Sequence, residues 1–212
     1  MIRAATLVLA ASLLGGCISL LPKPPPPPRT YVLEAQDVGE LAGEPIDAVI
    51  AIAQPTGERA ILGFDLVWRT GDTLAYVEQT QWSNRAADAL QAMLAETVIR
   101  QGRFRSSTRS GEARAEFEIR WEVLDFEVRE EDMTARFRAE VRLVTQGRQI
   151  VASRLVETSA PVSTRSSSVA AEALARAARE GGARIGEFAA NAAAEAMATA
   201  AEERSRQGGV DQ

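Results

Sequence analysis

Two runs of alternating apolar and charged residues constrain the fold more than any other feature of the sequence. They cover Ala115–Val123 and Met133–Leu143. A repeat of two residues places all the apolar side chains on one face of a β-strand. The alternation slips by one residue at Leu124, and one extra residue is what a β-bulge inserts. We therefore predict two long antiparallel strands, the first of them bulged or bent at Leu124.

Other segments of strand length surround this pair. Ala48–Ala53 is apolar without a break, which is typical of a central strand covered on both faces. Ala60–Val77 reads as a hairpin that turns at Gly71, and we expect Gln79–Trp82 to be a connector. Short strands are also predicted at Thr30–Glu34 and Ile150–Ser159.

A helix is predicted over Asn84–Gln101. Its apolar residues recur at intervals of three and four, which places them on one stripe. Ser83 or Asn84 would cap its first turn, and Gly102 stands where a left-handed residue commonly ends a helix. The stripe consists of Ala86, Leu90, Met93, Leu94, Thr97 and Val98.

A second, Ala-rich helix is predicted over Val169–Arg204. Gly181 and Gly182 lie inside it, where each glycine costs about 1 kcal/mol relative to alanine. They mark either a kink or a close approach of the helix to the sheet. The stripe of small residues along this helix suits packing on a sheet or contact with another copy of the chain, so a homo-oligomer is possible.

These elements define one domain of the α+β class. We expect a mainly antiparallel sheet with two principal helices packed on one face. The domain would cover residues 30–203, followed by a flexible tail at 204–212.

The segment before the domain has the parts of an export signal. Arg3 supplies a positive charge, and Ala4–Leu14 is almost wholly apolar but shorter than the roughly 20 residues that span a bilayer as a helix. Cys17 is the only cysteine in the chain, so no disulfide framework is possible. We predict a signal peptide at residues 1–16, cleaved between Gly16 and Cys17.

The end of this segment resembles the bacterial lipobox through Leu14, Gly15, Gly16 and Cys17. The resemblance implies that the Cys17 thiol carries a diacylglyceryl group, and more than one acyl chain gives stable membrane anchoring. Ile18, where an Asp would favour retention, implies the outer membrane by similarity to lipoprotein sorting in Gram-negative bacteria. The alternative is an ordinary secretory signal or weak anchor with a chance cysteine.

Residues 17–29 read as the lipidated cysteine and a tether. Pro24–Pro28 are five consecutive prolines, which fit neither helix nor sheet because their φ is fixed and they lack an N–H group. As polyproline II, the stretch Ile18–Arg29 would reach roughly 35 Å. A ligand for a proline-binding module is the alternative interpretation.

Composition argues against catalysis and nucleic-acid binding. The chain has no histidine, the commonest general base and metal ligand, and its net charge of −5 repels phosphate backbones. A phosphate-binding glycine loop is also missing. The carboxylates of Glu130–Asp132 lie in a predicted hairpin turn and are expected to solvate it. We predict no enzymatic activity, cofactor or metal, and no nucleic-acid partner.

The tryptophans are candidates for a lipid or partner groove. Trp68 and Trp121 share the inward phase of their strands, so core packing is the simpler interpretation for both. Trp82 immediately precedes the first helix, where an apolar residue can pack on the opening turns. It is the residue we single out as a possible partner surface.

Several of these residues together resemble a known family, the ABC-type transport auxiliary lipoproteins, which include the PqiC-type proteins. The resemblance rests on the lipobox and on Tyr31, Trp68, Tyr76, Gln81–Ser83, Leu90, Leu94 and Gly102–Phe104. It implies a non-catalytic accessory that docks an ABC transporter and an MCE-domain protein at the outer membrane during lipid transport. Only the lipidated Cys17 is carried over as a site residue. The alternatives are a standalone lipid-binding carrier with an internal apolar cavity and an envelope-assembly lipoprotein.

Overall fold

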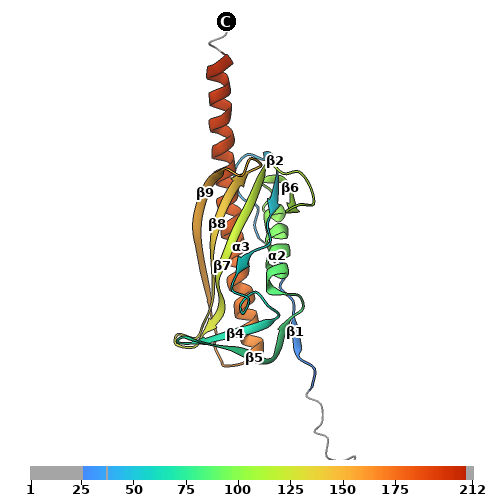
Figure 1. Cartoon of the computed structure of the whole chain (residues 1–212), viewed down its shortest axis with the longest axis vertical. Helices are drawn as coiled ribbons and strands as arrows, with labels where there is room; N and C mark the ends of the chain where they lie inside the picture. The colour runs from blue at the N-terminus through green and yellow to red at the C-terminus, as the bar shows by residue number, and fades with distance from the viewer. Residues whose placement is uncertain (1–25, 37, 209–212) are drawn as a thin grey trace, which may run out of the picture.

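A computed structural model describes residues 26–36 and 38–208 of the 212-residue chain (Figure 1). The predicted signal peptide, Gly16, Cys17 and the tether up to residue 25 lie outside the described residues, as does the end of the predicted tail at 209–212.

The described chain is α+β, which confirms the predicted class. Strands and helices follow one another as β1 (Arg29–Tyr31), β2 (Ile46–Ile52), β3 (Thr56–Gly57), β4 (Asp65–Thr70), β5 (Thr73–Trp82), α2 (Ala86–Arg100), β6 (Phe104–Arg109), β7 (Phe117–Arg129), β8 (Thr134–Thr145), β9 (Ile150–Pro161) and α3 (Ser167–Gly208).

The sheet is organised around the long strand β7. Along one side β7 is antiparallel to β8, which is in turn antiparallel to β9. Along its other side β7 pairs in parallel with β2 and β3 in its first half and with β4 near its end. β2 continues to β6, and β4 continues through β5 to β1. The longest ladders are antiparallel as expected, while the parallel pairings make the sheet mixed.

The slip in the sequence pattern is a bulge in the structure. The register between β7 and β8 shifts between Val123 and Asp125, which confirms the irregularity predicted at Leu124. After the bulge, four consecutive residues from Asp125 to Val128 are buried. Before the bulge one face of β7 is exposed to solvent, whereas after the bulge both faces are covered.

An aromatic cluster forms the centre of the core. Trp82 stacks on Phe126 with ring centroids 5.6 Å apart, and Phe126 meets Phe137 edge to face at 6.3 Å. Trp121 lies 6.4 Å from Phe137. Trp68 and Trp121 are buried, as their phase predicts.

The two helices contact one another, and each contacts the sheet. α3 packs along β8 and β9 and reaches β7, while α2 lies against β6 (Figure 1). Gly181 allows the close approach of α3, because a Cβ atom there would lie 2.3 Å from Cδ1 of Phe137. α3 runs through both glycines as one helix, so close approach, and not a kink, is what they provide.

The start of α2 differs from the prediction. Its N-cap is Arg85, which makes no capping hydrogen bond with its side chain, so the cap predicted at Ser83 or Asn84 is wrong. The N–H of Ala86 instead donates to the carbonyl of Gly63 at 2.7 Å. This backbone hydrogen bond satisfies one of the N–H groups at the start of the helix, which a capping side chain commonly binds. Gly102 follows the helix with φ of +72°, as predicted.

Three other boundaries also differ. The connector predicted at Gln79–Trp82 is the end of β5, which pairs with β1. The strand β6 was not predicted, because Phe104–Arg109 is rich in hydroxyl side chains and lacks an apolar alternation. α3 continues to Gly208, so residues 204–208 of the predicted tail are helical. Neither described helix is long and apolar enough to cross a membrane.

Candidate functional site

The tether enters the domain at one pole. Pro26–Pro28 have no regular structure, and β1 then pairs in parallel with the end of β5, where Tyr31 lies opposite Trp82. The N–H of Ser83 also donates to the carbonyl of Tyr31 at 2.7 Å. Figure 1 shows β1 at the lower end of the molecule, where the chain leaves toward its N-terminus. The chain is therefore fixed to the sheet directly after these prolines.

The segment after β1 is fixed to α3. The guanidinium Nε of Arg179 donates to the carbonyl of Glu34 at 2.9 Å, and burial lowers the pKa of Arg179. A groove of about 350 Å³ remains beside this contact, between residues 31–36 and the first half of α3. Val32 is largely exposed there. Side-chain contacts thus hold this pole together, and a shallow groove remains on its surface.

Trp82 is almost completely buried, and it lines the inner side of the groove beside residues 31–36. Only 3% of the residue is exposed, since it ends β5 on the core side and stacks on Phe126. Packing is therefore its main role in the isolated domain, and the partner surface at Trp82 stays a prediction. The apolar side chain before α2 is explained by the core it completes.

Beyond the bulge, a cluster of paired charges lies on the face of the sheet opposite to the face that carries Phe126 and Phe137. The carboxylate of Glu127 is fully buried and lies 2.5 Å from Nε of Arg69, a hydrogen bond that raises the pKa of Arg69. Asp125 lies 2.9 Å from Nε of Arg138 on the neighbouring strand. Because each buried carboxylate faces a guanidinium, the cluster is suited to holding β4, β7 and β8 together.

Two exposed carboxylates are bound by backbone or side-chain donors. Glu116 accepts the N–H of Val49 at 2.7 Å, and this hydrogen bond lowers its pKa. Asp132 accepts the hydroxyl of Thr134 at 2.5 Å, which lowers the pKa of Asp132. Within the described part of the chain, acidic side chains form no cluster suited to a metal ion. These carboxylates hold local turns and strand ends.

A second groove lies at the other pole. It has a volume of about 430 Å³ and separates the start of β9 from the distal part of α3. We call it the distal groove and define it by Ile150, Val151, Ala192, Glu195, Ala196, Ala200 and Glu203. Ile150 is 64% exposed beside it. Sequence periodicity did not reveal this site. Periodicity predicts which face of a single helix or strand is buried, but it does not predict which end of the assembled sheet is left without a covering element.

Comparison with known families identifies the class of protein. The sequence model of the ABC-type transport auxiliary lipoprotein component matches residues 31–186, which extend from β1 into α3. The chain belongs to this family, and the resemblance stated from its sequence is confirmed. The family is an auxiliary component of transport, associated with ABC transport components and described as a lipoprotein. No curated protein sequence matches the chain.

Solved structures share the fold. The crystal structure of protein XCC0632 from Xanthomonas campestris, of the DUF330 family, superposes with a TM-score of 0.74 at 17% identity, covering 80% of this chain and 98% of that one. A crystal structure of an uncharacterized protein matches with a TM-score of 0.63 at 13% identity, covering 77% and 99%. A dodecamer of PelC from Paraburkholderia phytofirmans reaches only 0.38, at 15% identity and 67% and 93% coverage, too low to relate its assembly to this chain.

Proposed function

We propose that this protein is an outer-membrane lipoprotein, anchored on the periplasmic side through acyl chains on Cys17, that docks an ABC transporter and its MCE-domain protein during lipid transport between membranes. Its role would be non-catalytic. The observation that carries the proposal is the position of the family match, which begins at residue 31, directly after a lipobox-like segment and a proline-rich tether.

The described domain supports a role in mechanical attachment. Its first strand is paired into the sheet within three residues of the last tether proline. The prolines favour an extended conformation at about 3.1 Å per residue, so the tether would hold the domain away from the bilayer while restricting its orientation. A docking component needs both properties.

Anchoring is tested by Cys17→Ser in the full-length chain. We expect the wild type to incorporate labelled palmitate and to fractionate with the outer membrane. The variant should incorporate no label, stay uncleaved at Gly16 and leave the outer-membrane fraction. A variant that carried label, or a wild type found free in the cytosol, would contradict the proposal.

Partnership is tested by cross-linking in intact cells followed by purification of this chain. We expect the MCE-domain protein of its transport system to be recovered with the wild type and lost with Cys17→Ser, which can no longer reach the correct membrane. Recovery of a different transporter class would contradict the proposed system.

The carrier alternative makes a separate prediction. A carrier would hold lipid in a shielded apolar cavity, whereas the two grooves described above are open surface features between elements. Mass spectrometry of solvent extracts from the purified chain should therefore show no lipid in stoichiometric amount beyond the acyl groups on Cys17. Stoichiometric phospholipid would favour the carrier.

A further inference from the structure

The distal groove combines apolar walls with an acidic rim, and Thr145, Gln149 and Thr199 complete its lining. Ile150 and Val151 supply one wall, and small side chains of α3 at positions 192, 196 and 200 supply the other. These three alanines are spaced by four residues, so they form one row along the helix. A row of small side chains allows a second helix to approach closely. The shape thus suits an extended apolar ridge better than a compact small molecule.

The charged side chains that line the groove are both acidic, and the nearest basic one, Arg204, lies one turn beyond and donates to the carbonyl of Ala200 at 3.0 Å. Glu195 and Glu203 are the charged residues that line it. Both are exposed, and neither makes an ion pair with any residue that the structure describes. A partner that placed basic side chains beside its apolar ridge would therefore meet complementary charges.

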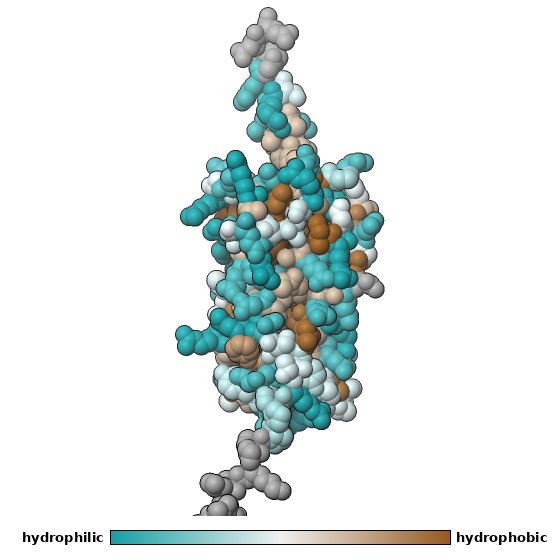
Figure 2. Space-filling model, turned by 90° about the vertical axis from the view of Figure 1, so that its right-hand side faces the viewer, coloured by the Kyte–Doolittle hydropathy of each residue, from teal (hydrophilic) through white to brown (hydrophobic). Residues whose placement is uncertain are grey.

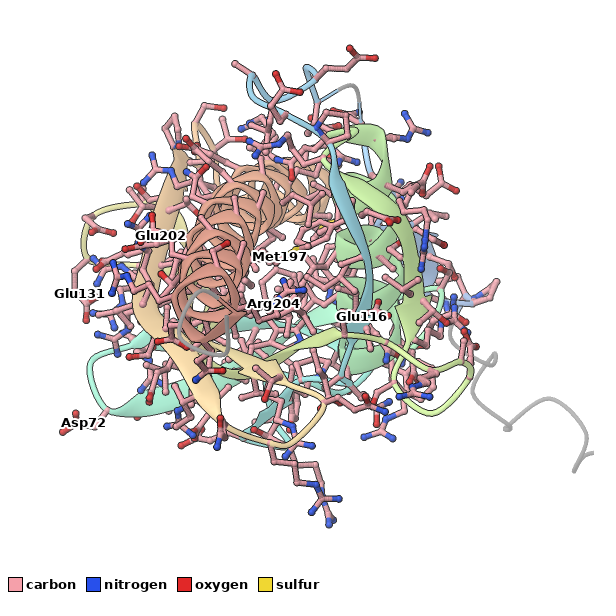
Figure 3. The ribbon with its side chains drawn as sticks, turned by 90° about the horizontal axis from the view of Figure 1, so that it is seen from above. Asp72, Glu116, Glu131, Met197, Glu202 and Arg204 are labelled. Atoms are coloured by element: carbon pink, nitrogen blue, oxygen red, sulfur yellow. The ribbon has the colours of Figure 1, made fainter. Side chains whose placement is uncertain are left out.

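The end of α3 has no support from the domain. Every residue from 197 to 207 is exposed, and the helix rises clear of the body in Figures 1 and 2. Viewed along the helix, Met197 and Arg204 lie on one side and Glu202 on another (Figure 3). Isolated helices of this length are marginal in water, so packing against a partner would stabilise this segment.

The neighbouring edge of the sheet is partly closed to a partner strand. Guanidinium groups of Arg184 and Arg176, on α3, donate to the backbone carbonyls of Glu157 and Pro161 on β9 at 3.1 and 3.3 Å. Main-chain pairing along the second half of β9 would have to displace both arginines. A helix lying in the groove requires no such displacement.

We propose that the distal groove binds an amphipathic helix of the transporter partner, with apolar residues against Ile150 and Ala200 and basic residues beside Glu195 and Glu203. The identity of the partner rests on the proposed function above. The groove lies at the pole opposite β1 (Figure 1), so a domain tethered through β1 presents it away from its own membrane. A component reaching across from the other membrane would meet this pole first.

A second copy of the chain fits the groove less well. In a two-fold contact the same patch faces itself, so Glu195 and Glu203 would meet the carboxylates of the copy. The chain also carries a net charge of −5, which opposes its own association. Charge complementarity therefore favours a basic helix over another copy.

The experiment measures binding of the periplasmic domain of the cognate MCE-domain protein to the full-length chain in lipid nanodiscs. Ile150→Asp removes the apolar wall, and Glu203→Arg reverses the rim charge. We expect Ile150→Asp to weaken binding by about tenfold or more, as loss of a central interface residue does. Glu203→Arg should have a similar effect, because it sets a like charge against the basic residues of the partner. Leu155→Asp and Glu202→Arg are the matched controls, because Leu155 is 55% exposed on the same strand and Glu202 is exposed on the same helix, both outside the groove. They should change affinity less than twofold.

The outcomes separate this inference from the proposed function. If the wild type binds but groove and control variants behave alike, the docking surface is wrong and the proposed function stands. If the wild type does not bind the MCE domain, the proposed function fails, and an 18-residue Leu/Lys amphipathic peptide becomes the probe. Binding of that peptide must be lost in Ile150→Asp and absent for a Leu/Glu peptide, or the inference falls as well. Light scattering in which groove variants alone dissociate a homo-oligomer would assign the groove to a second copy and overturn it.

Discussion

The two halves of α3 have similar compositions and opposite environments. Both are rich in alanine. Ala170 to Ala193 includes a long series of fully buried alanines against the sheet and α2, whereas residues 197–207 are exposed on every side. Helix propensity is therefore high in both halves, but only the first is held by tertiary packing. The comparison shows that composition predicts the helix, while contacts with the sheet and α2 distinguish the part that belongs to the domain.

The largest effect should come from removing the surface on which the first half rests. Phe137 is fully buried and contacts Phe126 and Trp121. Phe137→Ala should lower the free energy of unfolding by about 3–5 kcal/mol, since it leaves a cavity under α3. Urea denaturation of the full-length chain measures this change. A loss below about 1 kcal/mol would mean that α3 does not depend on the aromatic cluster.

Gly181→Ala tests the close approach itself. In an ordinary helix interior this change would stabilise by about 1 kcal/mol, but here the new Cβ would lie 2.3 Å from the ring of Phe137. The ring is fully buried between Phe126 and Trp121, so its displacement should disturb the core, and we expect a net loss of about 1–3 kcal/mol. The sign of the change is decisive, because a gain in stability would show that helix and sheet are not in tight contact.

The features recovered from the sequence are those with a local cause. Alternation along β7 and β8, the slip at Leu124 and the glycine after α2 each follow from a few neighbouring residues. The strand β6 and the last part of β5 depend on partners far along the chain, namely β2 and β1. Their sequences, rich in Ser, Thr and Gln, give no sign of such pairing without the partner.

The candidate site followed the same division. The lipobox-like segment at Cys17 is a local pattern, and the site there stays a prediction because it lies outside the described residues. For Trp82, the neighbours in sequence do not reveal that it stacks on Phe126 in the core. The distal groove joins residue 150 to residue 200, and no local pattern connects two such positions.

One substitution made in each half of α3 sharpens the comparison further. Ala177 is fully buried in the first half, and Ala200 is exposed in the second. Ala177→Gly should lower the global free energy of unfolding by about 1 kcal/mol or slightly more. Ala200→Gly should leave it unchanged and raise only the hydrogen-exchange rates of amides after residue 196, because opening there breaks no tertiary contact. Equal global losses would show that the distal segment folds with the domain.

The smallest expected effect on stability comes from deleting residues 197–212. The described part of this segment has no buried residue, so the free energy of unfolding, measured by urea denaturation, should change by no more than a neutral surface substitution does, about 0.5 kcal/mol. The same deletion removes Ala200 and Glu203, part of one wall and part of the rim of the distal groove, and should reduce partner binding as strongly as Glu203→Arg. Because a segment that adds nothing to stability has no structural reason to remain an ordered, projecting helix, unchanged stability with lost binding would tie the distal half of α3 to recognition. Retained binding would show that the distal half of α3 takes no part in partner recognition at the distal groove.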